Sequence, residues 1–150
     1  KAPEKDYYKG KPDYKIGDGL LIKNGKDVTI FCSGNITEEV LDAAKKLENK
    51  NIKAKIVSMI SLKPINSKFV ISQIKSKNVV TVEEHSEIGG LGSSIASILM
   101  DSNLSNRVSF KKIALKDRCH KEIGSHNYLR KLNKLDSDSI AKIILQSIKK

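Results

Sequence analysis

Short apolar runs that alternate with amphipathic stretches restrict the fold of this sequence more than any other feature. Residues 28–32 (Val-Thr-Ile-Phe-Cys) and 54–59 are compact apolar runs, typical of strands covered on both faces. Between them, apolar side chains recur at helical spacing after Thr37, which we expect to cap the helix. A strand, a helix and another strand in this order indicate parallel pairing through a right-handed crossover.

The same order continues to the end of the chain. Further strands are predicted at residues 78–82 and 107–115, and the last helix is expected to be capped by Asp136 or Ser137. The fold class is therefore α/β, a three-layer α/β/α domain with a mostly parallel sheet of about five strands. Ligands bind such sheets at the carboxyl ends of the strands. The loops expected there are residues 33–35, 58–64, 83–92 and 116–126, and further helices are expected near residues 67–74, 94–100 and 125–133.

One strand is expected to be antiparallel. Residues 20–22 form a short apolar run that is separated from residues 28–32 by an Asn24-Gly25 pair. Because Asn-Gly is a strong signal for a tight turn, we predict a hairpin between the two runs. The first run would then be a short antiparallel edge strand.

The first fifteen residues show no apolar periodicity. They contain two prolines and a glycine, which indicates an extended linker from a missing preceding domain, followed by one domain over residues 16–150. The chain begins without a signal peptide, and no apolar run approaches the ~20 residues of a membrane span. Its two cysteines make neither a disulfide framework nor a zinc ligand set. We therefore expect a cytoplasmic protein with no membrane partner.

The charge is strongly basic, with 28 Lys and Arg against 17 Asp and Glu and a formal net charge of +11. Nearly all of the cations are lysines, whereas specific base recognition favours arginine. A solvated lysine surface is the expected interpretation, with no nucleic-acid partner. The alternative is a basic module that binds polyanions or nucleic acid through residues 45–77.

The stretch from residue 82 to residue 94 is the most informative for function. A strand that runs into glycines before a helix can cradle phosphate, but Gly90-Leu91-Gly92 lacks the third glycine of the dinucleotide motif, since Ile95 occupies that position. Three nearby glutamates would also repel a pyrophosphate. We expect the glycines to allow close packing and a sharp turn. A stand-alone nucleotide site at residues 89–94 remains the other interpretation.

Two further residues were considered as catalytic groups. His85 lies between Glu84 and Ser86 and is either a general acid or base oriented by a carboxylate, or a loop histidine satisfied locally or by a partner surface. Cys119 adjoins His120, but neighbouring side chains rarely point together as a catalytic pair requires. Cys32 is expected to be a small core residue. From the residues alone we predict no catalytic, cofactor-binding or metal-binding residue in this chain.

Five short motifs occur in an order that resembles the C-terminal domain of the transketolase family. The likeness is strongest to the separate C-terminal subunits of split transketolases, and weaker to deoxyxylulose-phosphate synthase and the β subunits of 2-oxo-acid dehydrogenases. It covers about residues 14–148, and it departs from the family at residues 119–122, Cys-His-Lys-Glu. The motifs are residues 14–19, 25–30, 63–65, 82–93 (Val-Glu-Glu-His followed by Gly-Gly-Leu-Gly-Ser) and 116–118.

The resemblance implies part of a thiamine-diphosphate-dependent transferase that moves a two-carbon ketol unit between sugar phosphates. Thiamine diphosphate and Mg²⁺ would be held by N-terminal and middle domains or by a separate subunit, and this domain would bind neither of them. The full enzyme would be a homo-oligomer. The domain would support dimer assembly and the substrate entrance and would be inactive alone. The candidate interface or substrate-entrance loop consists of Glu84, His85, Gly89, Gly90 and Gly92.

Overall fold

The most deeply buried strand is β2 (Val28–Cys32), all five of whose residues are buried. The computed structural model describes residues 15–119 and 121–148, so the predicted linker lies outside the described residues except for its last residue. In the sheet β2 lies between β3 (Ala54–Met59) and β4 (Asn78–Ser86), parallel to both. The other elements are β1 (Gly19–Lys23), β5 (Ser109–Leu115), the 3₁₀ helix η1 (Gly34–Ile36) and the helices α1 (Thr37–Glu48), α2 (Ser67–Gln73), α3 (Leu91–Asp101), α4 (His126–Leu132) and α5 (Ser137–Ile148).

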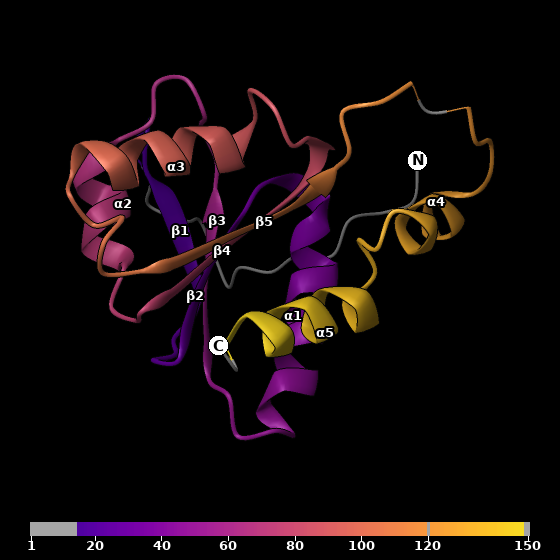
Figure 1. The fold of residues 1–150 in the computed structure, drawn as a ribbon, viewed down its shortest axis with the longest axis horizontal. Helices are drawn as coiled ribbons and strands as arrows, with labels where there is room; N and C mark the ends of the chain where they lie inside the picture. The colour runs from indigo at the N-terminus through magenta and orange to yellow at the C-terminus, as the bar shows by residue number, and fades with distance from the viewer. Residues whose placement is uncertain (1–14, 120, 149–150) are drawn as a thin grey trace.

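The strands lie in the order β1-β3-β2-β4-β5, and helices cover both faces of the sheet (Figure 1). Because side chains alternate along a strand, Ile30 packs with α1 and α5, whereas Phe31 packs with α2 and α3. The two clusters form the cores on either side of the sheet. The three-layer α/β/α fold with one antiparallel edge strand is thus confirmed, while α4 extends away from the sheet (Figure 1).

The predicted hairpin is wrong. β1 is an antiparallel edge strand, but it pairs with β3 rather than with β2, as in Gly19 opposite Met59. The connection crosses the start of β3, where the amide of Lys26 donates to the Lys53 carbonyl (3.1 Å). Both edges of β2 are occupied by parallel partners, and the free edge that the short connection reaches is the outer edge of β3. The Asn-Gly signal marked the bend correctly but not the partner strand.

Two predicted boundaries also change. β4 extends to Ser86, because its pairing with β5 continues through Ser86 and Leu115, so the connection to α3 is only residues 87–90. Thr37 is the first residue of α1 and not its cap: η1 precedes the helix, and the Thr37 hydroxyl donates to the Gly34 carbonyl (2.7 Å). Asp136 does cap α5, since its Oδ1 accepts from the amide of Ser139 (3.1 Å).

The crossing of β3 requires glycine at position 25. A Cβ there would overlap the carbonyl carbon of Ala54 and lie 2.6 Å from the carbonyl oxygen of Lys53. We expect Gly25→Ala to lower the free energy of unfolding by about 1–3 kcal/mol, because the backbone of β3 would have to move. Urea unfolding measures the loss, and the neighbouring exposed substitution Lys26→Ala should change stability by no more than about 0.5 kcal/mol. Equal stability of the two variants would contradict this account of the crossing.

Candidate functional site at the carboxyl end of the sheet

The buried carboxylate of Glu83 holds the start of α3. Its oxygens accept hydrogen bonds from the amides of Leu91 (2.7 Å) and Gly92 (2.8 Å), and the residue is only 1% exposed. A Cβ on Gly90 would overlap this carboxylate, and one on Gly92 would lie 2.9 Å from Oγ1 of Thr81. The glycines therefore serve close packing between the strand and the helix, as the sequence suggested.

This arrangement leaves no anion site at the start of α3. A phosphate at a helix N-terminus binds the free amides of the first turn. Here two of those amides are already bonded to Glu83, whose negative charge occupies the position that a phosphate would take. The structure thus counts against a stand-alone nucleotide site at residues 89–94.

The turn before α3 is fixed by local hydrogen bonds. Gly89 has a φ of +78°, which favours glycine, and its amide donates to Oγ of Ser93 (3.0 Å). The carbonyl of Glu87 accepts from Nζ of Lys112 (2.8 Å). Ile88, between them, is 62% exposed. An ordered loop thus presents an apolar side chain at the carboxyl end of the sheet.

Glu84 points to the opposite face of the sheet from Glu83 and forms an ion-pair cluster. Arg130 of α4 donates from Nε to Oε1 (2.7 Å) and from Nη2 to Oε2 (2.8 Å), a bidentate arrangement. Nε2 of His126 lies 2.7 Å from the same Oε1. Nη1 of Arg130 is also 3.5 Å from Glu39, whose other oxygen accepts from the amide of Ser137 (2.7 Å). The cluster therefore connects β4, α1, α4 and the start of α5.

The electrostatics of the cluster favour its charged form. Partial burial by itself raises the pKa of Glu84, but the hydrogen bonds and positive charge of Arg130, with the hydrogen bond of His126, outweigh it and hold that pKa below its usual value. The hydrogen bonds that Arg130 donates to Glu84 raise the pKa of Arg130 above its ordinary value, against the effect of burial. The side chain of Arg130 is only 7% exposed, so the pair is largely shielded from water.

A pocket of about 530 Å³ adjoins this cluster. Its walls combine charged groups with leucines from β5 and α4, and it opens beside η1. The prediction from sequence included His126 at the end of a carboxyl-end loop but missed Arg130. One sequence signal was present, since Arg130 is one of only three arginines in a lysine-rich chain. The lining residues are Asn35, Glu84, Leu115, Glu122, His126, Leu129, Arg130, Asn133 and Leu135.

His85 is not oriented by a carboxylate. Its side chain is exposed, and it makes no hydrogen bond to other described residues. Its neighbour Glu84 is directed to Arg130 and His126 instead. The pairing that an acid–base role would need is therefore absent within residues 15–119 and 121–148, and His85 is left as an exposed group near the loop of residues 87–90.

Cys32 is a core residue, as predicted. Cys32 is fully buried in β2, and burial raises the pKa of its thiol to about 12, against the effect of the Thr37 hydroxyl. Such a thiol stays protonated and unreactive at neutral pH. Cys119 is exposed, and the proposed neighbour His120 lies outside the described residues.

The basic segment of residues 45–77 does not form one binding face. Lys55 is 7% exposed and donates to the carbonyl of Gln73 at the end of α2 (3.0 Å). Burial, and then the charge of a neighbouring lysine, lower the pKa of Lys55. Lys45 and Lys46 form ion pairs with aspartates of α1 and α5. The segment is divided among two helices and a buried strand, which does not support the nucleic-acid alternative.

Residues 15–119 and 121–148 contain neither a candidate membrane span nor a candidate metal cluster. No helix there is long and apolar enough to cross a bilayer. Among the same residues, no three or more His, Cys, Asp or Glu side chains are placed to hold a metal ion.

We expect Arg130→Met to lower the free energy of unfolding by about 3 kcal/mol at pH 7, because Glu84 would remain buried without its partner. The loss should shrink as the pH is lowered. Since the folded-state pKa of Glu84 is depressed, the pair contributes its stability above the unfolded pKa of about 4.3 and loses it as the pH falls through the folded-state pKa. Urea unfolding from pH 7 to pH 3 measures both effects.

The matched control is Arg118→Met. Arg118 forms an ion pair with Glu122 (2.7 Å), but its side chain is 48% exposed, so its removal should cost less than about 1 kcal/mol. A loss for Arg130→Met that is as small as the control, or that does not depend on pH, would contradict the assigned role of the Glu84 pair.

Comparison with known proteins identifies the family. Residues 17–141 match the model of the transketolase C-terminal domain. A putative transketolase C-terminal section of Methanocaldococcus jannaschii is 37% identical over 138 residues, which are 91% of this chain and 42% of that protein. A 1-deoxy-D-xylulose-5-phosphate synthase of Halothermothrix orenii is 31% identical, over 89% of this chain and 21% of that enzyme.

A solved structure agrees with these relatives. The inactive β4 tetramer of a split-gene transketolase superposes with a TM-score of 0.86 at 31% identity, covering 97% of this chain and 47% of that one. The chain thus spans less than half the length of each of these three proteins. The sequence motifs, the three-layer fold and the family model agree, and the chain belongs to the transketolase C-terminal domain family.

Proposed function

We propose that this chain is the C-terminal domain of a thiamine-diphosphate-dependent enzyme that transfers a ketol unit between sugar phosphates. The observation that carries the proposal is the match to the transketolase C-terminal domain across residues 17–141. The rest of the enzyme would supply the N-terminal and middle domains, as a fused segment or as a separate subunit, in a cytoplasmic homo-oligomer. The domain would support assembly and the substrate entrance without being catalytic alone.

The described residues of this chain do not fit the cofactor. A diphosphate bound through Mg²⁺ needs oxygen ligands for the metal and free donors for the phosphates. The first amides of α3 are bonded to Glu83, and no group of three or more metal-binding side chains is found among residues 15–119 and 121–148. No step of the transfer is therefore assigned to this chain, and its proposed contribution is to position the rest of the enzyme.

The surface proposed for this contact is the carboxyl end of the sheet. Ile60 follows β3 and is 42% exposed, and Ile88 follows β4 and is 62% exposed. Ile16, 78% exposed, precedes the antiparallel strand β1 and so lies at the same end. Exposed apolar side chains that gather at one end of a sheet are typical of an interaction surface. The candidate loop lies at this end of the sheet and consists of Glu84, His85, Gly89, Gly90 and Gly92. The proposed role of Glu84 and Gly90 is to hold the loop in place through their contacts with Arg130 and Glu83.

We expect Ile88→Asp to weaken assembly with the remaining subunits or domains at least tenfold, because a charge would replace apolar contact area. The matched control is Met100→Asp, a 65% exposed apolar residue at the end of α3, toward the opposite edge of the sheet. Light scattering on the co-expressed protein measures the assembly, and ketol transfer from a ketose phosphate measures activity. An unchanged assembly constant for Ile88→Asp, or an equal loss for both variants, would contradict this surface.

We expect His85→Ala to lower kcat/KM of the assembled enzyme by about threefold to tenfold, because the exposed imidazole would be lost from the contact surface. Its stability should not change, because the imidazole makes no hydrogen bond to the other described residues. Steady-state kinetics and thermal unfolding measure the two effects on one preparation. Normal assembly and normal kinetics of the variant would remove His85 from the contact surface.

A further inference from the structure

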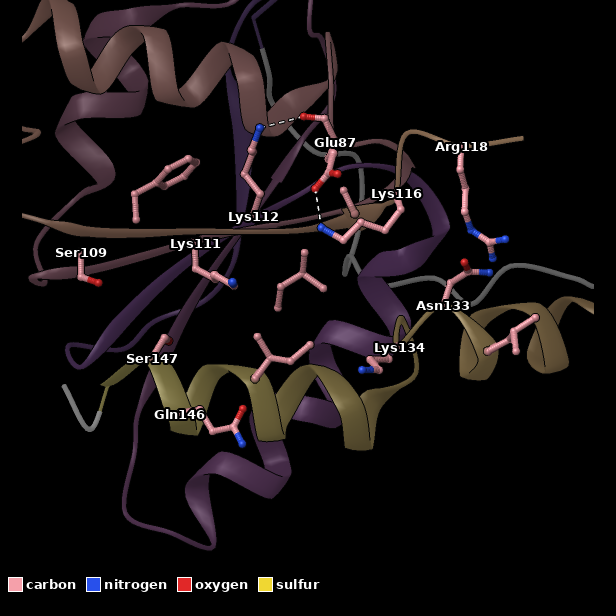
Figure 2. A pocket seen from close by; sticks show the side chains of 15 residues that line it. Glu87, Ser109, Lys111, Lys112, Lys116, Arg118, Asn133, Lys134, Gln146 and Ser147 are labelled. Atoms are coloured by element: carbon pink, nitrogen blue, oxygen red, sulfur yellow. Dashed lines mark hydrogen bonds and ion pairs between the residues drawn. The ribbon is translucent and has the colours of Figure 1, made fainter. Parts of the chain in front are cut away.

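A large groove runs along the outer edge of the sheet and reaches its carboxyl end at Glu87 and Lys116. It has a volume of about 1010 Å³ and lies between β5, the second half of α5 and the segment that joins α4 to α5 (Figure 2). Its apolar wall includes Ile113 of β5, Leu132 of α4 and Ile143 of α5. The neighbouring cations come from the strand, the loop after it and the α4–α5 connection: Lys111, Lys112, Lys116, Arg118 and Lys134.

The strand that forms this groove has an unpaired outer edge. β5 is the last strand of the sheet and pairs only with β4 among the described strands. The amide of Ser109 donates to Lys77 and the carbonyl of Leu115 accepts from Glu87, so the odd-numbered residues direct their backbone groups at β4. Because these groups alternate along a strand, the N–H and C=O of Lys112 and Ala114 point outward. Such an edge can accept another strand.

The charge of the groove is unbalanced. Glu87 is the only acidic residue in its lining, and it is held by Lys116 (2.8 Å). Lys111 and Lys134 are exposed and form no ion pair with a described carboxylate. Figure 2 shows both side chains beside the groove, one from β5 and one from the α4–α5 connection. A polar edge flanked by unpaired cations and an apolar wall is complementary to a strand with alternating acidic and apolar side chains.

We propose that this groove binds an extended acidic segment of another polypeptide, which adds to the sheet as a sixth strand beside β5. The free backbone groups of β5 give the segment its register, and the apolar wall takes alternate side chains. The cations select acidic side chains. This interaction is separate from the proposed function, because it uses the lateral edge of β5, whereas the proposed contact with the rest of the enzyme uses Ile16, Ile60 and Ile88, none of which lines the groove.

Other occupants fit the groove less well. Two copies of β5 would bring Lys111 and Lys112 of each copy close together, and like charges on neighbouring strands are destabilising. Single-stranded nucleic acid needs exposed aromatic side chains for stacking, whereas the only aromatic residue in the lining is the partly buried Phe110. Lysines on an edge strand discourage the pairing of two copies of β5, and they favour an acidic strand as the partner.

The experiment uses the intact protein and a blocked eight-residue peptide of alternating Glu and Val, titrated by calorimetry and by NMR of the amides of β5. We expect binding that shifts the amides of residues 110–114. N-methylation of the peptide at alternate residues should abolish binding when it blocks the edge that faces β5, and not when it blocks the other edge. Lys111→Glu with Lys134→Glu should weaken binding at least tenfold, while the matched double change Lys50→Glu with Lys68→Glu should change it less than twofold.

Several outcomes would overturn the proposal. Absence of binding would do so directly. Equal binding of the two N-methylated peptides would show general electrostatic attraction instead of strand addition. An equal loss in both double variants, or an equal affinity for a single-stranded oligonucleotide, would assign the effect to the net charge of the protein. Because one arm modifies only the peptide, the proposal stays testable even if a protein variant does not fold.

Discussion

The structure depends on one buried carboxylate. Removing the charge of Glu83 from water is costly, and two amide hydrogen bonds together with the dipole of α3 offset that cost. This contact sets the distance between β4 and α3, and the glycine at position 90 follows from it because a side chain there would overlap the carboxylate. The same contact uses the amides that a phosphate would need. A sequence pattern that resembles a nucleotide loop therefore has a structural role here.

Two consecutive glutamates connect the two helical layers. Because side chains alternate along β4, Glu83 binds the layer of α2 and α3, whereas Glu84 binds Arg130 on the side of α1 and α5. Both carboxylates sit at the carboxyl end of the strand, just before the turn with exposed Ile88. The start of α3 binds Glu83 and Arg130 binds Glu84, so the strand end before this turn is held on both faces of the sheet. A docking surface built on such a loop can stay ordered before the rest of the enzyme binds.

Features of the fold that depend on a local pattern of residues could be predicted from the sequence. Strands β2 and β3 have the expected bounds, since continuous apolar runs report burial on both faces. The partner of β1 could not be predicted, because the choice depends on the edges of β2 being occupied by strands far along the chain. The Glu84–Arg130 pair was missed for the same reason: 46 residues separate its members, and the helix expected near residues 125–133 carries no signal that shows which strand it contacts. The glycines at positions 90 and 92 allow close packing as expected, but their spacing does not show which group they approach, so Glu83 was not predicted as their partner.

The lysines that make the chain basic have different structural roles. Lys55 is buried as a partner for the end of α2, and Lys45 and Lys46 are paired with aspartates, so these cations are not available to a polyanion. Among the described residues that line the groove, Lys111 and Lys134 form no ion pair and lie beside the backbone groups of β5 that point away from β4. A lysine on an edge strand has opposite effects on two partners: it repels a second copy of the same edge and attracts an acidic strand. In a family whose members include subunits of split enzymes, an edge that discriminates in this way lets a separate chain associate with other proteins without aggregating with itself.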